Sequence, residues 1–328
     1  MTMTDNKRSA KQLILWYESQ KRPLPWRQNR DPYRIWISEI MLQQTTTKAV
    51  INYYIRFMER FPNLKSLAQA DLPSVYEQWA GLGYYSRARN IHKSAQILSK
   101  SGFPENYRAL IELPGFGPYT SRAVSSQAFG EKVGVVDGNV NRVYCRIFND
   151  SSDWWSKHTQ NKIQAWSDDL CQNEDPSEMN QALMELGATI CTPKSPTCLI
   201  CPWSDGCNAF KTQSQHLVPK QKPKRKSEIW IWNPEVYINP KNEFMLVEKD
   251  DISFLKNKWI FPGEAFKVEE KPKKYDYKHS ITHHDIYVKV LKLKIKPKTI
   301  SEKTCYVKIN NLSQKSPFSL MKKALEFI

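Results

Sequence analysis

The sequence predicts a protein of two domains, in which an all-α domain is followed by a smaller α+β domain. The chain has 328 residues, more than a single ordinary domain holds. Residues 9–210 carry helical hydrophobic patterns broken at Pro and Gly, whereas short β-branched and aromatic runs follow residue 226. Residues 211–226 are basic and poor in apolar side chains, as exposed tethers are. We therefore predict a helical domain over 1–212, a linker over 213–227 and an α+β domain over 228–328.

The first domain is predicted to be helical throughout. Asp31 offers an N-cap, and Pro32 suits the first turn of the helix that follows it. No part of this half alternates between apolar and polar residues as a half-buried strand does. The segments with helical patterns are 33–42, 46–59, 72–79, 87–100, 107–112, 119–129, 139–148, 157–170 and 176–190.

The second domain is predicted to be built mainly from strands. Its β-branched and aromatic runs are short and partly alternating, which favours strands over helices. One segment near the C-terminus has a helical pattern instead. The predicted strands are 229–238, 244–248, 286–295 and 304–309, and the predicted helix is 317–327.

The charge of the chain favours a polyanionic partner. The net charge is +16, and residues 211–328 contribute 25 Lys and Arg against 13 Asp and Glu, or +12 of it. Such a field attracts nucleic acid because each neutralised phosphate releases counterions, although a lysine-rich surface also serves solubility alone. No run of eighteen apolar residues exists, and the polar segment 1–8 lacks the apolar core of a secretory signal. We expect a cytoplasmic, DNA-associated protein, with no membrane partner, and monomeric.

Four of the seven cysteines form one tight cluster, Cys191-x6-Cys198-x2-Cys201-x5-Cys207. A cluster of this kind in a chain without a secretory signal indicates a metal site rather than a disulfide framework. Four thiolates suit either a [4Fe–4S] cluster or a tetrahedral zinc ion. Zinc ribbons usually offer two close C-x2-C pairs, and only one is present here. The spacing therefore favours iron and sulfur.

A second motif is the glycine-rich segment 113–117 (LPGFG), which joins two predicted helices. Two glycines around one apolar residue, Gly115 and Gly117, allow a tight hairpin. Its outward N–H groups and the N-terminus of the next helix can hold an anion such as a DNA phosphate. A plain corner between two helices would also favour Pro and Gly.

The order of these motifs resembles the helix-hairpin-helix DNA glycosylase superfamily. The hairpin is followed by the segment 136–140 (VDGNV) and then by the cysteine loop. Within the superfamily, segments 36–45 (WISEIMLQQT) and 81–87 (GLGYYSR) resemble the adenine DNA glycosylases, or MutY family. The resemblance runs from about Leu13 to Phe210. It implies an enzyme that removes adenine opposite 8-oxoguanine or guanine in duplex DNA during base excision repair, and that carries a [4Fe–4S] cluster.

Two carboxylates are the candidate catalytic groups. Glu39 follows Trp36 and Ile35 on a mostly apolar helix, where burial would raise its pKa and suit it to act as a general acid. The matching Glu of the family protonates N7 of adenine. Asp137 precedes a predicted helix that it can cap, and the resemblance gives it the further role of stabilising the oxocarbenium-like sugar. Asn139 matches a residue that helps to orient this site.

Tyr119 separates two types of reaction. Related bifunctional glycosylases carry a lysine at this position of the hairpin, and its Schiff base leads to strand cleavage. A tyrosine cannot form an imine. We therefore expect base removal by water, which leaves an abasic site without a lyase step.

The remaining candidate residues follow from the resemblance and from the need to flip the base out of the duplex. The adenine pocket is expected to contain Arg22, Trp26 and Gln181. The side chains expected to enter the duplex are Gln44, Thr45, Leu82 and Tyr84, with Tyr84 as an aromatic wedge. Arg87 and Arg89 are expected to suit phosphates.

The C-terminal domain resembles a Nudix fold at segment 259–264 (WIFPGE). Glu269 and Glu270 are followed at once by Lys271-Pro272, so the acidic metal-binding helix of Nudix hydrolases is not expected. Segment 279–284 (HSITHH) resembles the loop that senses 8-oxoguanine, with Thr282 and His283 as the contacting residues and with Ile281 where the family has an aromatic. Because strand neighbours point to opposite faces, we expect no metal at these histidines.

Two other functions fit the same scaffold. One is a glycosylase for pyrimidine or thymine mispairs, which segment 42–45 (LQQT) and the lesion-sensing loop disfavour. The other is a DNA-binding protein without catalysis, which the intact pair of Glu39 and Asp137 disfavours.

Overall fold

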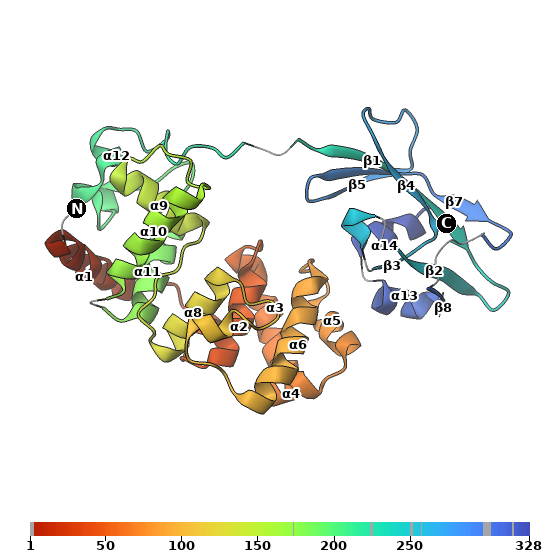
Figure 1. Cartoon of the computed structure of the whole chain (residues 1–328), viewed down its shortest axis with the longest axis horizontal. Coiled ribbons are helices and arrows are strands. Elements are labelled where there is room, and N and C mark those ends of the chain that lie inside the picture. Colours follow the sequence, from red (N-terminus) through yellow and green to blue (C-terminus); the bar gives the residue numbers. More distant parts are fainter. Residues whose placement is uncertain are drawn as a thin grey trace. The chain divides into compact units, whose positions relative to one another are not determined.

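The computed structural model describes residues 3–172, 174–223, 226–249, 252–256, 258–297, 303–316 and 318–328. The chain divides into two compact units, Met1–Lys222 and Pro223–Ile328 (Figure 1). The boundary lies inside the predicted linker, but ten residues later than its predicted start at 213. Val218 is buried, and its carbonyl oxygen accepts a hydrogen bond from Arg146 Nε at 3.1 Å. Residues 213–222 of the predicted linker are therefore part of the helical unit, which corrects the prediction.

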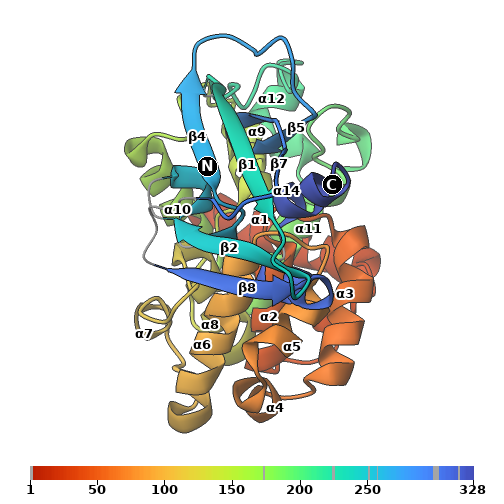
Figure 2. The same ribbon diagram turned by 90° about the vertical axis from the view of Figure 1, so that its right-hand side faces the viewer.

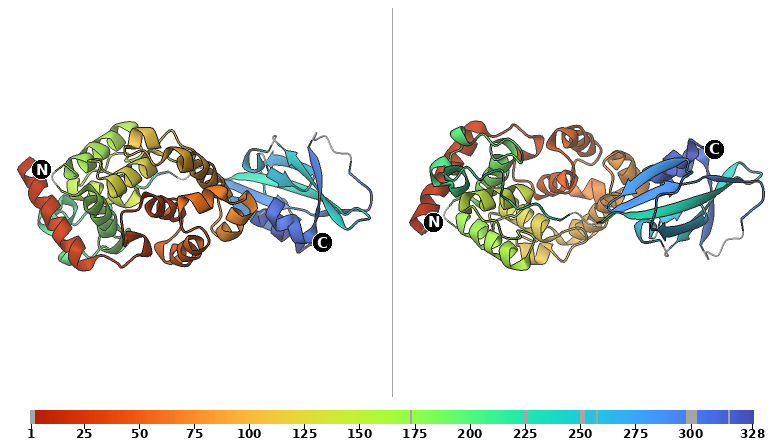
Figure 3. Two further views of the ribbon diagram at one scale, coloured as in Figure 1. Left: turned by 90° about the horizontal axis from the view of Figure 1, so that it is seen from below. Right: turned by 90° about the horizontal axis from the view of Figure 1, so that it is seen from above.

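The first unit is helical, and its described residues contain no strand (Figure 3). All the predicted helices are present, with ends that differ by a few residues. Helices α1, α4 and α12 were not predicted. None of the described helices is both long and apolar enough to cross a membrane. The elements are α1 (Met3–Gln20), η1 (Pro25–Arg27), α2 (Pro32–Leu42), α3 (Thr47–Arg60), α4 (Leu64–Gln69), α5 (Leu72–Trp79), α6 (Tyr85–Ser101), α7 (Tyr107–Leu110), α8 (Pro118–Phe129), α9 (Gly138–Phe148), α10 (Lys157–Leu170), α11 (Pro176–Thr189), η2 (Cys198–Ile200), η3 (Ser204–Gly206) and α12 (Asn208–Lys211).

Side-chain caps set the start of several helices. The Asp31 carboxylate accepts from the Tyr33 N–H at 2.8 Å, with Pro32 in the first turn of α2, as predicted. Asp137 caps α9 in the same way, through the Val140 N–H at 2.7 Å. Caps of this type typically contribute about 1 kcal/mol, and they fix where a helix begins. The residues from Asp137 to Val140 therefore determine where α9 begins, and the same hydrogen bond fixes the Asp137 side chain.

The helical unit has two hydrophobic cores. The first contains buried side chains of α2–α6, among them Trp36, Phe57 and Trp79, which are at most 1% exposed. The second contains side chains of α1 and α9–α11 together with the cysteine loop. Helix α8 contacts α2 of the first group and α11 of the second. The hairpin helix thus joins the two cores, and residues from both reach one cavity beside it.

The second unit is an α+β unit with two sheets. In the larger sheet the order is β4-β1-β6-β5, with β7 also paired to β1, and the smaller sheet has the order β3-β2-β8. Figure 2 shows β1 beside β4, with which it is antiparallel, whereas β1 and β6 are parallel. The elements are β1 (Glu228–Tyr237), β2 (Glu243–Lys249), η4 (Ser253–Leu255), β3 (Lys258–Ile260), β4 (Gly263–Val268), β5 (Tyr277–Ile281), β6 (His284–Val288), β7 (Leu291–Leu293), β8 (Thr304–Lys308), α13 (Ile309–Lys315) and α14 (Ser319–Leu325).

The structure corrects the predicted strands in three ways. Strands β3, β4 and β5 were not predicted, because β3 is short and β4 and β5 are rich in polar residues. The predicted strand 286–295 is two strands, β6 and β7, broken at Lys289 and Val290. Ile309, predicted to end a strand, begins α13, and the predicted C-terminal helix begins at Ser319, with Pro317 outside the described residues. No helix follows Glu269 and Glu270, as predicted.

Candidate active site

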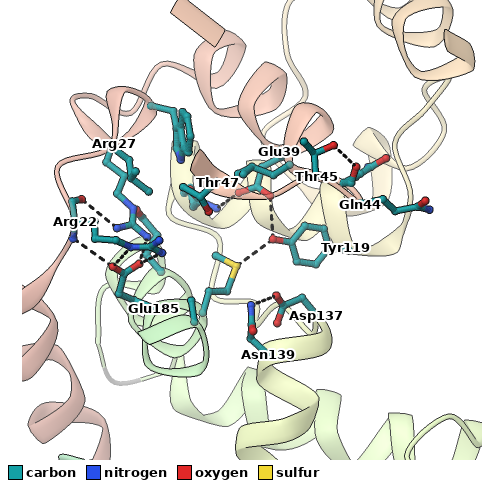
Figure 4. A pocket seen from close by; sticks show the side chains of 18 residues that line it. Arg22, Arg27, Glu39, Gln44, Thr45, Thr47, Tyr119, Asp137, Asn139 and Glu185 are labelled. Atoms are coloured by element: carbon teal, nitrogen blue, oxygen red, sulfur yellow. Dashed lines mark hydrogen bonds and ion pairs between the residues drawn. The ribbon is translucent and has the colours of Figure 1, made fainter. Parts of the chain in front are cut away.

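Glu39 is a buried acid on α2. Glu39 is only 6% exposed. Its two carboxyl oxygens accept hydrogen bonds from Gln127 Nε2 at 3.1 Å and from the Tyr119 hydroxyl at 2.9 Å (Figure 4). Burial raises the pKa of this carboxyl group, and the two donors only partly oppose the rise. The group is therefore suited to keep a proton at a pH where an exposed glutamate has lost it.

Asp137 is the second carboxylate of the same cavity. Besides the Val140 N–H, it accepts a hydrogen bond from Asn139 Nδ2 at 2.9 Å. Burial raises the pKa of Asp137 too, but these donors oppose the rise, and the N-terminus of α9 adds its positive dipole end. Glu39 and Asp137 both line a cavity of about 510 Å³, a usual size for a ligand pocket.

Tyr119 lies between the two carboxyl groups in the view of Figure 4. It stands in the first turn of α8, directly after the hairpin. Its hydroxyl donates to Glu39 and lies 3.1 Å from Met184 Sδ. Burial raises the pKa of Tyr119 well above its ordinary value, so the hydroxyl remains a neutral donor. The four predicted catalytic residues, including Asn139, thus line one cavity.

The three residues predicted for the adenine pocket line the same cavity. Trp26 is 8% exposed and meets Tyr54 edge-on, with ring centroids 5.3 Å apart. The side-chain oxygen of Gln181, Oε1, accepts a hydrogen bond from the Tyr17 hydroxyl at 3.1 Å, which fixes the orientation of the side-chain amide. Arg22, however, is not free to contact a base with its whole guanidinium group, because Nε and Nη2 bind Glu185.

Sequence reasoning missed Glu185 and Arg27. Glu185 is 1% exposed and binds Arg22 at 2.6 Å and Arg27 at 2.8 Å. The two arginines hold the pKa of this carboxylate below its ordinary value against the effect of burial. Glu185 stands four residues after Gln181 on α11, so the helical period could have placed it in the cavity.

Two loops beside the cavity carry the side chains predicted to enter DNA. Gln44 and Thr45 follow α2 and line the cavity mouth with Thr47 (Figure 4). Tyr84 is 51% exposed and has a left-handed backbone, with φ +48°. Leu82 is only 7% exposed and belongs to the first core, so the prediction that it projects into the duplex is wrong for this structure.

Arg87 corrects a second prediction, because its guanidinium is not offered to phosphates. Nη1 donates to the carbonyl oxygens of Ile40 at 2.7 Å and Gln43 at 2.6 Å, and Nη2 donates to that of Leu82 at 3.2 Å. Arg87 therefore ties the end of α2 to the loop before α6. Arg89 remains exposed.

The hairpin Leu113–Gly117 has the predicted tight turn. The Phe116 N–H bonds the Leu113 carbonyl oxygen at 3.1 Å, and Gly117 is the N-cap of α8. Gly115 has φ +83°, and a Cβ there would lie 2.8 Å from Asn90 Cβ. Both the backbone conformation and the close approach of α6 therefore require glycine at position 115.

The four clustered cysteines line one small cavity next to Arg146. Arg146 Nη1 lies 3.4 Å from Cys191 Sγ and donates to the Thr192 carbonyl oxygen at 2.7 Å, so a cation already faces the thiols. Four thiols around one cavity are a donor set that fits an iron–sulfur cluster. Among the described residues, no three of these sulfurs come within 4.8 Å of one another.

One arginine links this loop to the carboxylate site. Arg142 Nη2 donates to Asn139 Oδ1 at 2.8 Å and to the Gly187 carbonyl oxygen at 2.7 Å. Its Nε donates to the Cys191 carbonyl oxygen at 2.7 Å. A chain of hydrogen bonds thus runs from Cys191 through Arg142 and Asn139 to Asp137.

In the C-terminal unit, Thr282 and His283 form the turn between β5 and β6. Thr282 has a left-handed backbone, with φ +55°. The rings of His283 and His284 lie on the same side, with centroids 4.0 Å apart. The prediction that neighbouring histidines point to opposite faces is wrong here, because His283 stands in a turn and not in a strand.

The fold and the paired buried carboxylates define a base excision DNA glycosylase. The sequence model of the HhH-GPD superfamily, described as a base excision DNA repair protein, matches residues 37–168. The chain is 32% identical over 329 residues to the adenine DNA glycosylase of Buchnera aphidicola subsp. Baizongia pistaciae, a match that covers 91% of this chain and 90% of the relative. The chain belongs to the adenine DNA glycosylase family.

Another adenine DNA glycosylase and two solved glycosylase-fold structures match about two thirds of the chain. The human adenine DNA glycosylase is 43% identical over 215 residues, which are 62% of this chain and 39% of the human protein. A solved structure of a thermostable thymine-DNA glycosylase matches with a TM-score of 0.58 at 28% identity, over 64% of this chain and 98% of that one. A complex of endonuclease III with DNA, 22% identical with a TM-score of 0.55, shares the fold.

Proposed function

We propose that this adenine glycosylase acts on adenine opposite 8-oxoguanine or guanine in duplex DNA, by acid-assisted hydrolysis without strand cleavage. One observation carries the proposal: Glu39 and Asp137 line a single cavity, and the Tyr119 hydroxyl is bonded to the first of them. When two carboxyl groups in one cavity have different surroundings, their pKa values differ, so one can serve as the acid and the other as the anion.

Glu39 is the acid in this mechanism. Its carboxyl proton passes to N7 of the flipped adenine while the bond between C1′ and N9 breaks. The bonding electron pair leaves with the purine, where the added proton neutralises it. A positive charge develops on the sugar, and water then attacks C1′ and returns a proton to Glu39. The products are adenine and an abasic site, and proton transfer of this kind typically contributes about 10²–10⁴-fold in rate.

Asp137 is the anion that stabilises the sugar cation. Its donors, the Val140 N–H and the Asn139 amide, favour the charged form and leave the carboxylate aimed at the cavity. A carboxylate in a site closed to water interacts more strongly with a nearby cation than it would in solvent. Asn139 orients the carboxylate and is itself held by Arg142.

The absence of a lyase step follows from the residue at position 119. Tyr119 occupies the place where an imine-forming lysine would stand, and the phenol donates to Glu39 instead. The hydroxyl also limits how far Glu39 can rotate. Tyr119 therefore serves to hold the acid, and the DNA strand is left intact.

The DNA duplex is proposed to contact four parts of the chain. The hairpin N–H groups at Gly115 and Gly117 would hold a phosphate. Tyr84 would wedge into the stack, with Gln44 and Thr45 near the opposite base. The exposed, left-handed Tyr84 supports this role. The basic C-terminal unit would add attraction to the phosphates, as its charge suggests.

The C-terminal unit is proposed to be a Nudix-like lesion-recognition domain. Its mixed sheet, with β1 between a parallel and an antiparallel neighbour, and the absence of an acidic helix after β4 in the described residues support this role. Thr282 and His283, at the tip of the β5–β6 turn, would contact 8-oxoguanine. Both side chains stand next to solvent, where a base could reach them.

Cys191, Cys198, Cys201 and Cys207 are proposed to hold a [4Fe–4S] cluster. A single zinc ion with bonds of about 2.3 Å would need sulfurs about 3.8 Å apart. The four cysteines line one cavity with Arg146 beside Cys191, and the spacing with a single C-x2-C pair supports an iron–sulfur centre. When bound, the cluster would fix the loop that carries Cys191. We expect about four iron atoms per purified chain and a broad visible absorption, which zinc would not give.

The test uses duplexes with one adenine opposite 8-oxoguanine or guanine, and control duplexes with thymine opposite guanine. Breakage after alkali at the adenine alone is expected, with no breakage before alkali. Breakage at the thymine would favour a thymine glycosylase instead. Glu39→Gln should lower the single-turnover rate by at least about 10²-fold and leave DNA affinity unchanged. Full activity of that variant would rule out the acid role.

A further inference from the structure

We propose that Glu228, His283 and His284 form a binding site for a divalent transition-metal ion of the zinc type. Glu228 begins β1, His283 ends the turn between β5 and β6, and His284 begins β6. One ligand atom from each residue can be chosen so that all three atoms lie within 4.8 Å of one another. Among the described residues, no other group of His, Cys, Asp or Glu brings three ligand atoms so close.

The turn holds the two imidazoles together. Thr282 is β-branched and yet has φ +55°, a conformation that such residues avoid. Its hydroxyl lies 3.4 Å from His283 Nδ1 and 3.3 Å from His284 Nδ1, between the two rings. The Glu228 N–H bonds the His283 carbonyl oxygen at 2.8 Å, which anchors the turn to β1. The Thr282 hydroxyl therefore contacts both imidazoles, and the main chain of the turn is bonded to the start of β1, before any ion binds.

The orientation of His284 points to a cation. Its Nδ1 lies 3.2 Å from the Ile281 carbonyl oxygen, which can only accept, so this contact favours the tautomer with the hydrogen on Nδ1. In that tautomer Nε2 is an acceptor, and it lies 3.5 Å from Glu228 Oε2. Two acceptors that face each other need a positive charge between them. Ligands at about 2.0–2.1 Å from a tetrahedral zinc ion are about 3.3–3.4 Å apart, close to this separation.

The donor set selects the class of metal. Two imidazoles and one carboxylate suit zinc and similar late transition metals, whereas magnesium and calcium prefer oxygen ligands alone. Glu228 is supported from behind by Trp230 Nε1 at 3.1 Å and by Lys267 Nζ at 2.8 Å. His284 Nδ1 is supported in the same way by the Ile281 carbonyl oxygen at 3.2 Å. Supporting bonds of this kind orient the ligands in natural zinc sites.

A bound ion would change the role of His283. The proposed function gives this histidine to the lesion base, so a metal ion on its ring would compete with 8-oxoguanine. This consequence depends on the proposed function, but the metal site itself does not. Zinc would then weaken the preference for 8-oxoguanine over guanine and leave adenine removal from the guanine mispair unchanged.

The site can be tested by calorimetric titration of Zn²⁺ into the full-length, cluster-loaded protein, with iron content measured before and after. One zinc per chain is expected. His283→Ala and Glu228→Gln should each weaken the affinity at least tenfold, since even the loss of a supporting contact costs about 10–100-fold. His279→Ala, which removes a neighbouring histidine bonded to Ser319 and not to this cluster, should bind zinc as the wild type does.

Two results would overturn the proposal. Wild-type protein that takes up no zinc would show that these three side chains do not form a metal site. Zinc uptake that is equal in wild type, His283→Ala and Glu228→Gln would place the ion elsewhere. Circular dichroism of the variants shows whether the unit is still folded. If zinc binds as expected but adenine is not removed from any duplex, the metal site stands and the proposed function fails.

Discussion

At the scale of the residue, the structure buries an acid in surroundings that favour its protonated form. Glu39 is 6% exposed, and the only polar groups bonded to it are neutral donors. An ionised carboxylate in such a place loses much of its solvation, and the two hydrogen bonds recover only part of it. The chain thus keeps an unfavourable buried carboxyl group at the position to which we assign the catalytic proton.

The pH profile of base removal should report the partners of Glu39. Activity requires its protonated form, so the rate falls as the pH rises through its pKa. The Tyr119 hydroxyl stabilises the anion and lowers that pKa. Tyr119→Phe should therefore move the alkaline limb of the single-turnover rate to higher pH, and Gln127→Leu should move it in the same direction. A limb that moves to lower pH in both variants would contradict this assignment.

Glu39→Gln should have opposite effects on stability and on activity. In the folded protein Glu39 keeps its proton above the pH at which the unfolded chain loses it, because its folded-state pKa is raised. The free energy of unfolding therefore falls as the pH rises above about 4.5, the ordinary value for glutamate. Glu39→Gln should be more stable at pH 8 by about 1 kcal/mol, or roughly 2–4 °C in Tm. The gain should shrink at pH 5, and an equal gain at both pH values would contradict the argument.

At the scale of the element, the site depends on side chains that tie helices and loops together. Arg87 on α6 holds the carbonyl oxygens at the end of α2 and in the loop before α6. Through these bonds one guanidinium sets the positions of Gln44, at the cavity mouth, and of Tyr84. Arg142 on α9 does the same between the cysteine loop and Asn139. Neither residue touches the space where adenine would lie.

Arg87→Lys should show that the fork of donors matters. A lysine cannot reach three carbonyl groups in a plane, so we expect a loss of about 2 kcal/mol in the free energy of unfolding. Base removal should slow as the α2 end loosens. Arg89→Ala, two residues away and exposed, is the matched control and should change stability by no more than about 0.5 kcal/mol. Equal losses in the two variants would contradict the proposed tie.

Arg142→Lys should reveal the link between the cluster and catalysis. The variant loses bonds to Cys191 and Asn139 at once, so iron content and the single-turnover rate should both fall. Asn139→Ala should lower the rate alone. Iron analysis and kinetics on the same preparations distinguish the two, and a normal rate with reduced iron in Arg142→Lys would break the proposed link.

Sequence reasoning succeeded where a local signal fixes a structure. Asp31 and Asp137 were predicted as caps, and they are caps, because capping depends on only three or four neighbouring residues. The gathering of Glu39, Tyr119 and Asp137 in one cavity was implied by the resemblance, and the structure confirms it. The predictions for Leu82 and Arg87 were wrong because these side chains are held by the core and the carbonyl groups that α2 provides, and a local pattern does not contain such contacts. The short polar strands β3–β5 failed because pairing, not composition, defines them.

At the scale of the whole molecule, charge and stability are divided between two units. Most of the net positive charge, +12 of +16, lies after residue 210, and the first unit ends at Lys222. The two carboxylates and the cysteine loop lie before it. The chain therefore separates the chemistry from much of the attraction for DNA.

A chain that ends at Lys222 should make this division measurable. Residues 1–222 form a compact unit, so the truncated protein should fold and still remove adenine opposite guanine. Its affinity for DNA should fall less steeply with salt than that of the full chain, because fewer counterions are released. The measurement is the slope of log Kd against log salt concentration for both proteins. Identical slopes would show that the C-terminal lysines do not reach the phosphates.

The left-handed backbone of Tyr84 has a kinetic consequence. The ring is held out before DNA arrives, and the strain of about 1–3 kcal/mol is borne by the free protein. If Tyr84 is the wedge that we propose, no rearrangement of the loop would delay each encounter with a base step. Only a step already weakened by a mispair would then yield to the ring, and the search would end there.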